Sequence, residues 1–129
     1  MIPARVVTSI LIVDDDPAFL GLATCVLEGM GIEVVARVLD AASAVPAAEA
    51  TRPNGALVDV GLPDRDGVDL AYELAALPWK PTVVLTSADA DAGRAIRLAP
   101  GRPRIPFVPK DQLTNGMLPL HLGADLGFH

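Results

Sequence analysis

Five side chains that could carry chemistry stand at the ends of short apolar runs in this sequence. Asp14 and Asp15 follow SILIV, Asp59 ends ALVD, Thr86 ends VVLT, and Lys110 follows FVP. Two carboxylates held about 4 Å apart repel by about 4 kcal/mol at an effective dielectric of 20. Three carboxylates that converge therefore need a cation. Mg²⁺, a hard ion that binds oxygen ligands, suits such a site.

An acidic metal site beside a lysine and a hydroxyl is suited to handling a phosphoryl group. The metal and Lys110 would neutralise charge on the phosphoryl oxygens, and Thr86 would donate a hydrogen bond to them. A carboxylate that faces the phosphorus can act as a nucleophile and form an aspartyl phosphate. Asp59 lies among apolar residues. A charge there is costly unless it is paired or bound to metal.

The elements that must bring these residues together alternate between strand-like and helix-like patterns. We expect strands at residues 9–13, 32–38, 56–60, 81–86 and 105–109. We expect helices from Pro17 to the glycine at 31, over 41–50, after Gly67, over 89–98 and, weakly, after Thr114. This alternation predicts an α/β fold, a flavodoxin-like doubly wound five-stranded parallel sheet in the order 2-1-3-4-5 with helices on both faces. Chemistry gathers at the carboxyl ends of such strands, where the five residues lie.

Local signals support the first two helices. Asp16 is a suitable N-cap with Pro17 in the first turn, and Gly31 can end that helix in a left-handed conformation. Asp40 is expected to cap the second helix. Cys25, the one cysteine of the chain, is expected to lie as a small hydrophobe on a buried helix face.

Composition narrows the class of protein. The chain has 129 residues, enough for one domain, and a formal net charge of -6. That charge argues against direct contact with nucleic acid and, weakly, against binding an anionic membrane. The sequence lacks an apolar run of about 20 residues that could span a membrane. Its N-terminus also lacks the long apolar run of a signal peptide. A cytoplasmic location is the expectation.

Four segments, LIVDDDP, ALVDVGLPDRDG, VVLTSAD and FVPKDQL, together resemble the signature segments of response-regulator receiver domains of two-component signalling. The resemblance runs from about residue 9 to residue 113. Each segment alone is weakly specific, but all four in order and at compatible separations form a strong signal. We therefore expect a single receiver domain over residues 1–129, with its core at about 9–122 and a short C-terminal tail. No output domain is expected, unless the chain is a fragment.

The resemblance implies a set of metal ligands and an acceptor. Asp59 would be the phosphoacceptor and a ligand of Mg²⁺. Asp15 would bind the ion directly, and Asp14 would do so directly or through water. The backbone carbonyl of Gly61 would be a further ligand.

The resemblance also implies a switch. Thr86 would bond to the phosphoryl group once it is present, and Lys110 would pair with it. Phe107 matches the aromatic residue that moves inward when the Thr86 hydroxyl is drawn away. Gly61 and Ala88 are small, which predicts that water reaches the phosphoryl group and shortens its lifetime.

The implied function is a phosphorylation-activated signalling switch. A sensor histidine kinase or a phosphotransfer protein would donate the phosphoryl group, and output would pass through protein contact. The domain would catalyse only its own phosphorylation and dephosphorylation, so it is not expected to be an enzyme acting on an external substrate. Whether it forms a homodimer stays open.

Two alternatives remain. One is a receiver-like interaction module that works without phosphorylation, which the irregular C-terminal third mildly favours. Prolines at 100, 103 and 106 stiffen the approach to the fifth strand, Pro109 suits only an edge strand, and Gly116 and Pro119 interrupt the last helix. The other is a phosphatase of the haloacid-dehalogenase type, with Asp14 as nucleophile and Asp16 as acid/base.

Overall fold

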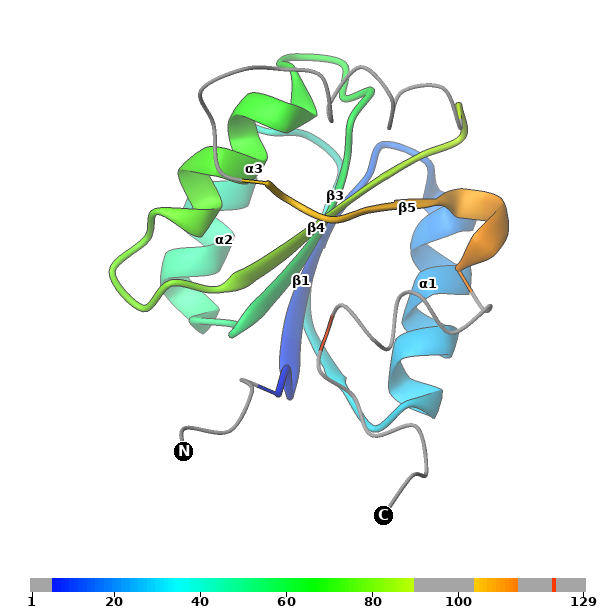
Figure 1. Ribbon diagram of the computed structural model, residues 1–129, viewed down its shortest axis with the longest axis horizontal. Helices are drawn as coiled ribbons and strands as arrows, with labels where there is room; N and C mark the ends of the chain where they lie inside the picture. The colour runs from blue at the N-terminus through cyan, green and yellow to red at the C-terminus, as the bar shows by residue number, and fades with distance from the viewer. Residues whose placement is uncertain (1–5, 90–103, 114–121, 123–129) are drawn as a thin grey trace.

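A five-stranded parallel sheet in the order β2-β1-β3-β4-β5 forms the centre of the computed structural model (Figure 1). The structure describes residues 6–89, 104–113 and 122. The strands are Ser9–Val13 (β1), Glu33–Val38 (β2), Gly55–Asp59 (β3), Thr82–Ser87 (β4) and Phe107–Pro109 (β5). The helices are Pro17–Gly29 (α1), Ala44–Thr51 (α2) and Gly67–Ala75 (α3), with a 3-10 turn at Lys110–Gln112 (η1). The predicted fold class and strand order are confirmed.

The sheet has helices on both faces, and its central strands are therefore apolar on both sides. Figure 1 shows α1 on one face and α2 and α3 on the other. In β1, Ile10 and Ile12 belong to the core on the α1 face, whereas Leu11 and Val13 belong to the core on the face of α2 and α3. A continuous run of β-branched and leucine side chains suits this environment, because neither face of the strand meets water.

The ends of α1 confirm the predicted capping signals. The Asp16 side chain accepts a hydrogen bond from the Ala18 N–H, and Pro17 occupies the first helical position. Gly31 has a φ of +83°, a left-handed conformation that glycine adopts without steric cost. The prediction for Cys25 was wrong, because this side chain is exposed. The buried stripe of α1 consists of Phe19, Leu20, Ala23 and Leu27, and Cys25 falls outside it.

The second helix begins later than predicted. It starts at Ala44 with Ser43 as its N-cap residue, and Asp40 instead accepts a hydrogen bond from the Ser43 N–H. Residues 41 and 42 lie outside the helix, and the carboxylate of Asp64 accepts hydrogen bonds from both of their N–H groups. These two N–H groups precede α2, so Asp64 holds the turn before the helix and does not cap the helix itself.

The edge position of β5 explains how it tolerates proline. β5 pairs with β4, with Pro109 opposite Ser87, and lies at the end of the sheet. It begins at Phe107 rather than at 105, while the carbonyl of Pro106 still accepts a bond from Leu85. The predicted helices over 89–98 and after Thr114 lie essentially outside the described residues. None of the described helices is both long enough and apolar enough to cross a membrane.

Candidate functional site

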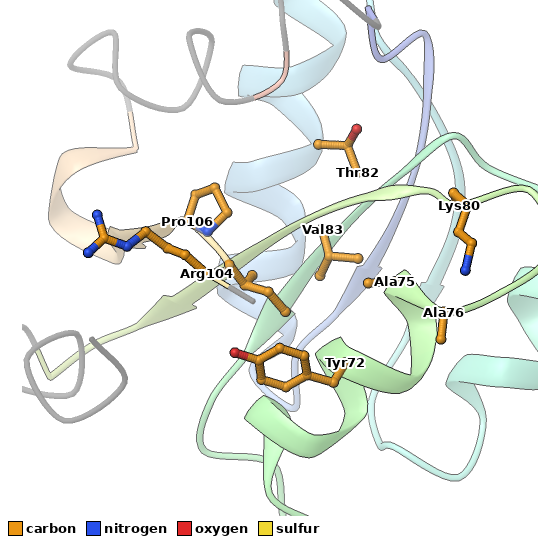
Figure 2. A pocket seen from close by; sticks show the side chains of 9 residues that line it. Tyr72, Ala75, Ala76, Lys80, Thr82, Val83, Arg104 and Pro106 are labelled. Atoms are coloured by element: carbon orange, nitrogen blue, oxygen red, sulfur yellow. The ribbon is translucent and has the colours of Figure 1, made fainter. Parts of the chain in front are cut away.

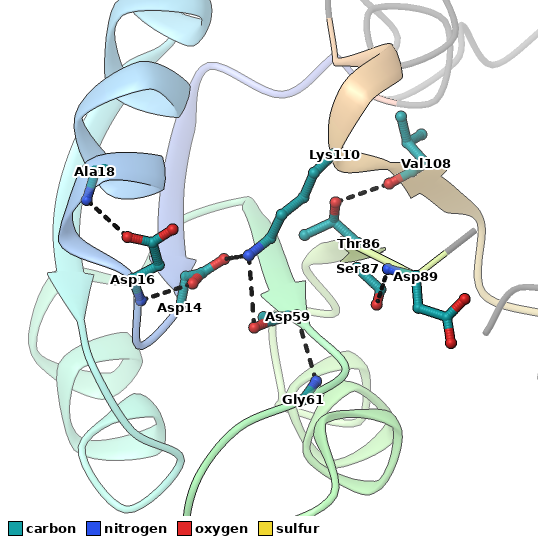
Figure 3. Close-up of polar contacts among 10 residues, drawn as sticks. All are labelled: Asp14, Asp16, Ala18, Asp59, Gly61, Thr86, Ser87, Asp89, Val108 and Lys110. Carbon is teal, nitrogen blue, oxygen red and sulfur yellow. Dashed lines mark hydrogen bonds and ion pairs between the residues drawn. The ribbon is translucent and has the colours of Figure 1, made fainter. Parts of the chain in front are cut away.

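Four of the predicted residues meet at the carboxyl edge of the sheet. Asp14 follows β1, Asp59 ends β3, Thr86 lies in β4 and Lys110 follows β5, and Figure 3 shows them around one small space. Asp14 is 0% exposed and Asp59 is 5% exposed, while Asp15 lies beside them and is exposed. The parallel sheet brings these residues together because it ends all of its strands at the same edge.

The ammonium group of Lys110 lies between two buried carboxylates. Its Nζ is 2.8 Å from Asp14 Oδ2 and 3.7 Å from Asp59 Oδ2. The other oxygen of Asp14 accepts a hydrogen bond from the Asp16 N–H, at 2.9 Å. Asp59 Oδ1 accepts one from the Gly61 N–H, at 3.3 Å. Each carboxylate thus has one oxygen bonded to the backbone and the other turned towards the lysine (Figure 3).

The donor set of this site fits a hard divalent cation. Asp14, Asp15 and Asp59 each offer a carboxylate oxygen, and these oxygens lie within 4.8 Å of one another. Asp14 Oδ2 is fully buried, and the Lys110 ammonium lies 2.8 Å from it. The site holds three carboxylates, of which Asp14 and Asp59 pair with the Lys110 ammonium, so it carries an excess of negative charge. Oxygen-only ligands with such an excess are what Mg²⁺ binds in proteins.

Burial and charge alter the proton affinities of Asp59 and Lys110. Burial, and then the nearby charge of Asp14, raise the pKa of Asp59 above its ordinary value, against the opposing effects of Lys110 and the Gly61 N–H. Burial acts to lower the pKa of Lys110, but contact with Asp14 and the charge of Asp59 outweigh it and raise this pKa. Lys110 therefore carries its positive charge at neutral pH.

Thr86 is next to Asp59 in the sheet, but its hydroxyl bonds to β5, on the other side of β4. It pairs with Asp59 across β3 and β4, and the Val60 N–H donates to its carbonyl at 2.9 Å. Its buried hydroxyl donates to the carbonyl of Val108 in β5, at 2.7 Å. Phe107, the neighbour of Val108, is partly buried against the core on the face of α2 and α3. The hydroxyl thus links β4 to β5 in this conformation.

Glycine at position 67 allows the loop after Asp59 to pass close to that residue. A Cβ at Gly67 would collide with the carbonyl oxygen of Asp59 and come within 2.8 Å of the Val60 Cα. The Gly67 N–H donates to Val60, and Asp66 caps α3 by accepting from the Val68 N–H. Any side chain at 67 would move the backbone that carries Asp59.

Sequence reasoning missed two residues near the site. The ring of Phe19 faces Lys110, with the ammonium nitrogen 4.4 Å from the ring centroid. The carboxylate of Asp64 ties the loop after β3 to the loop after β2. An aromatic residue on the buried stripe of the helix that follows the Asp cluster was the available signal for Phe19. No sequence signal pointed to the partners of Asp64.

A separate hollow lies on the other side of the domain. It has a volume of about 500 Å³ and lies between α3 and the beginnings of β4 and β5 (Figure 2). Its described lining is mainly apolar, with Tyr72, Val83 and Ile105 among the lining residues, and Lys80 and Arg104 contribute charge. It contains none of the residues that the sequence analysis assigned to the phosphoryl or metal site, so the candidate site remains the charged edge.

Comparisons with known proteins agree with the geometry. The profile of the response regulator receiver domain family matches residues 10–101. The DNA-binding response regulator MtrA of Mycolicibacterium smegmatis is 34% identical over 105 residues, which cover 79% of this chain and 46% of that protein. The transcriptional regulatory protein PdtaR of Mycobacterium tuberculosis is 36% identical over 84 residues, which cover 65% of this chain and 41% of that protein. The chain thus spans less than half the length of these relatives.

Solved structures show the same fold. A sensor protein from Polaromonas sp. JS666 superposes with a TM-score of 0.74 at 27% identity, covering 94% of both chains. The receiver domain of the response regulator NarL from Mycobacterium tuberculosis has a TM-score of 0.70 at 24% identity, and the match covers 92% of this chain and 98% of that one. At 24% identity, the match to the NarL receiver domain supports the fold alone.

Proposed function

Because the chain belongs to the response regulator receiver domain family, we propose that it works as a phosphorylation-activated signalling switch with Asp59 as its phosphoacceptor. A sensor histidine kinase or a phosphotransfer protein would supply the phosphoryl group in the cytoplasm. The observation that carries this proposal is the convergence of Asp14, Asp59 and Lys110, with Nζ–oxygen distances of 2.8 Å and 3.7 Å, from three separate strand ends.

In the proposed reaction Asp59 supplies the attacking oxygen. A bond forms between a carboxylate oxygen of Asp59 and the phosphorus, and the bond from phosphorus to the donor nitrogen breaks, leaving its electron pair on that nitrogen. Lys110 already lies beside the Asp59 carboxylate and would pair with the phosphoryl oxygens. Bound Mg²⁺, held by Asp14, Asp15, Asp59 and the Gly61 carbonyl, would supply further positive charge for those oxygens.

Thr86 and Phe107 would change conformation when Asp59 is phosphorylated. A phosphoryl oxygen on Asp59 is a stronger acceptor than the Val108 carbonyl that the Thr86 hydroxyl now bonds at 2.7 Å. Turning the hydroxyl towards Asp59 would break this link between β4 and β5 and let the Phe107 ring move inward. A protein partner would then bind the changed surface at β5.

The phosphatase alternative gains no support from the geometry around Asp16. Its carboxylate is occupied as the cap of α1, where it accepts from the Ala18 N–H at 3.0 Å. Asp14 is fully buried against Lys110, which leaves little room for it to act as a nucleophile on an external substrate. Hydrolysis of a generic phosphomonoester that is lost in Asp14→Asn but kept in Asp59→Asn would reverse this conclusion.

Nucleic acid is not among the proposed partners of this chain. Relatives described as DNA-binding or transcriptional regulators are more than twice as long as the part matched here. The formal net charge of -6 disfavours approach to a phosphate backbone. We therefore assign output to protein contact.

Incubation with acetyl phosphate and Mg²⁺, followed by intact-mass measurement, tests the proposal. We expect one phosphoryl adduct on the wild type, none on Asp59→Asn, and an adduct on the matched control Asp64→Asn, whose carboxylate faces the loop after β2. An unmodified wild type with every small-molecule and protein donor would leave the phosphorylation-independent module as the better account.

The lifetime of the adduct is a second readout. A Cβ at Gly61 would meet no atom within 4 Å, and Ala88 is also exposed. Water should therefore reach a phosphoryl group on Asp59 from this side, and we expect a short-lived aspartyl phosphate. A half-life of many hours would contradict this part of the proposal.

A further inference from the structure

The Lys110 ammonium has a third neighbour besides the two carboxylates. The ring of Phe19 lies under it, with the nitrogen 4.4 Å from the ring centroid. Phe19 is in the first turn of α1 and is 7% exposed. It belongs to the same buried cluster as Val108 and Leu113, which lie on either side of Lys110 in the chain. The ring is therefore held in place by the core.

The ring and the carboxylates hold the ammonium in different ways. A lysine has a flexible four-carbon stem, so the attraction of Asp14 and Asp59 alone leaves the ammonium several accessible positions. The face of an aromatic ring carries a negative quadrupole that attracts a cation at this distance. Because the ring is neutral, a divalent cation bound by the carboxylates would weaken their pull on Lys110 but leave the attraction of the ring in place.

We propose that Phe19 is a positioning residue for Lys110, whose ring face keeps the ammonium over Asp14 and Asp59 where it can meet an incoming phosphoryl group. This inference rests on the proposed function. It adds a residue of α1 to a site otherwise built from strand ends, and it makes the contribution of Lys110 dependent on the electron density of one buried ring.

Three changes separate this role from simple packing. Phe19→Leu keeps an apolar side chain but removes the ring. Replacement of Phe19 by 3,4,5-trifluorophenylalanine keeps the ring and nearly its size but withdraws electron density from its face. Lys110→Met removes the cation that the ring is proposed to hold. Urea unfolding of each protein monitors whether the fold is intact.

The rate of modification by acetyl phosphate with Mg²⁺ is the main readout. We expect Phe19→Leu to lower this rate about fivefold, within the range that a partly buried cation–π contact can give. The trifluorinated ring should lower it in the same direction. In a Lys110→Met background, Phe19→Leu should cause no further loss. In metal-free wild-type protein, we expect the ring current of Phe19 to shift the Lys110 ε-methylene protons upfield, and this shift should be absent in Phe19→Leu.

Each result decides between the two proposals. A wild type that no donor modifies overturns the proposed function and this inference with it. A modified wild type, with Phe19→Leu reacting at the same rate, overturns the inference alone. If Phe19→Leu is modified slowly but the trifluorinated protein is modified at the wild-type rate, the role of Phe19 is packing. The same conclusion follows if Phe19→Leu lowers the rate as much in the Lys110→Met background as in the wild type.

Discussion

Both edges of the sheet contain polar side chains, but the contacts that these side chains make differ between the two edges. At the amino edge, Asn54 Oδ1 accepts from the N–H groups of Thr8 and Ser9 at 2.9 Å and 3.1 Å, and its Nδ2 donates to Val6 at 3.0 Å. At the carboxyl edge, the oxygens of three carboxylates lie within 4.8 Å of one another, and the Lys110 ammonium contacts two of these carboxylates, Asp14 and Asp59. The Asn54 network is uncharged, whereas the cluster at the carboxyl edge carries an excess of negative charge.

This difference separates a structural role from a functional one. The Asn54 network ties the beginnings of β1 and β3 together and needs nothing from outside the chain. The carboxyl edge keeps buried negative charge that costs folding free energy. Lys110 offsets this cost in part, and a bound cation would offset more of it. Substitutions at the amino edge should therefore change stability without regard to Mg²⁺, and substitutions at the carboxyl edge should depend on it.

The largest effect is expected from Lys110→Met. Removing the ammonium leaves Asp14 and Asp59 facing each other without their cation, and breaking a buried ion pair costs about 3 kcal/mol or more. Urea unfolding without metal should show this loss, and added Mg²⁺ should restore part of it. The matched control Lys80→Met, at an exposed position, should lose less than about 1 kcal/mol. If Lys110→Met were as stable as the wild type in the presence of a chelator, the proposed difference between the two edges would be wrong.

Asn54→Ala tests the amino edge. The change removes the partner of the backbone groups of Thr8, Ser9 and Val6. Water can replace this partner at the exposed Thr8 and Val6, so we expect a loss of about 1 kcal/mol. The loss should be the same with and without Mg²⁺. Asn54→Asp keeps an acceptor for the two N–H groups and should lose less. A loss that depends on Mg²⁺ would show that the two edges are coupled.

Asp59→Asn should raise stability in metal-free buffer by about 1 kcal/mol, because it relieves repulsion at a site with excess negative charge. The pKa of Asp59 lies above its ordinary 3.8 in the folded chain. The folded state therefore holds more protons than the unfolded state above that pH, and wild-type stability falls as the pH rises through this window. The variant should lack this fall in urea unfolding at a series of pH values. Lower stability of Asp59→Asn at neutral pH would contradict the expectation.

The smallest effect concerns Asp64, which is exposed. Hydrogen bonds from Ala41 and then Ala42 lower its pKa below the ordinary 3.8. A lowered pKa in an acid means that the stabilisation is complete above pH 3.8 and is lost as the pH falls through the folded value. Hydrogen exchange at the amides of Ala41 and Ala42 should accelerate at low pH, relative to its intrinsic rate. In Asp64→Asn the exchange should be faster already at neutral pH, and an unchanged rate would show that the contact is not formed in solution.

Much of the fold and the principal charged groups could be predicted from sequence because they depend on local pattern. A continuous apolar run such as Ser9–Val13 favours a strand covered on both faces, and β1 has the predicted bounds. Asp14, Asp59 and Lys110 each stand at a strand end, so the parallel topology alone brings them together. The roles of the Gly61 carbonyl and of Phe107 remain predictions, since they depend on an ion and a modification.

The sequence by itself determined the periodicity of the elements, the strand order and the edge at which the acids collect. Tertiary structure alone decided which ring lies under Lys110, which loop the Asp64 carboxylate reaches, where α2 begins, and that Cys25 faces outward. The physical reason is the range of the contacts. Patterns of apolar residues act over a few neighbours in the chain, whereas these pairings join residues from different elements and exist only once the sheet and its helices have packed.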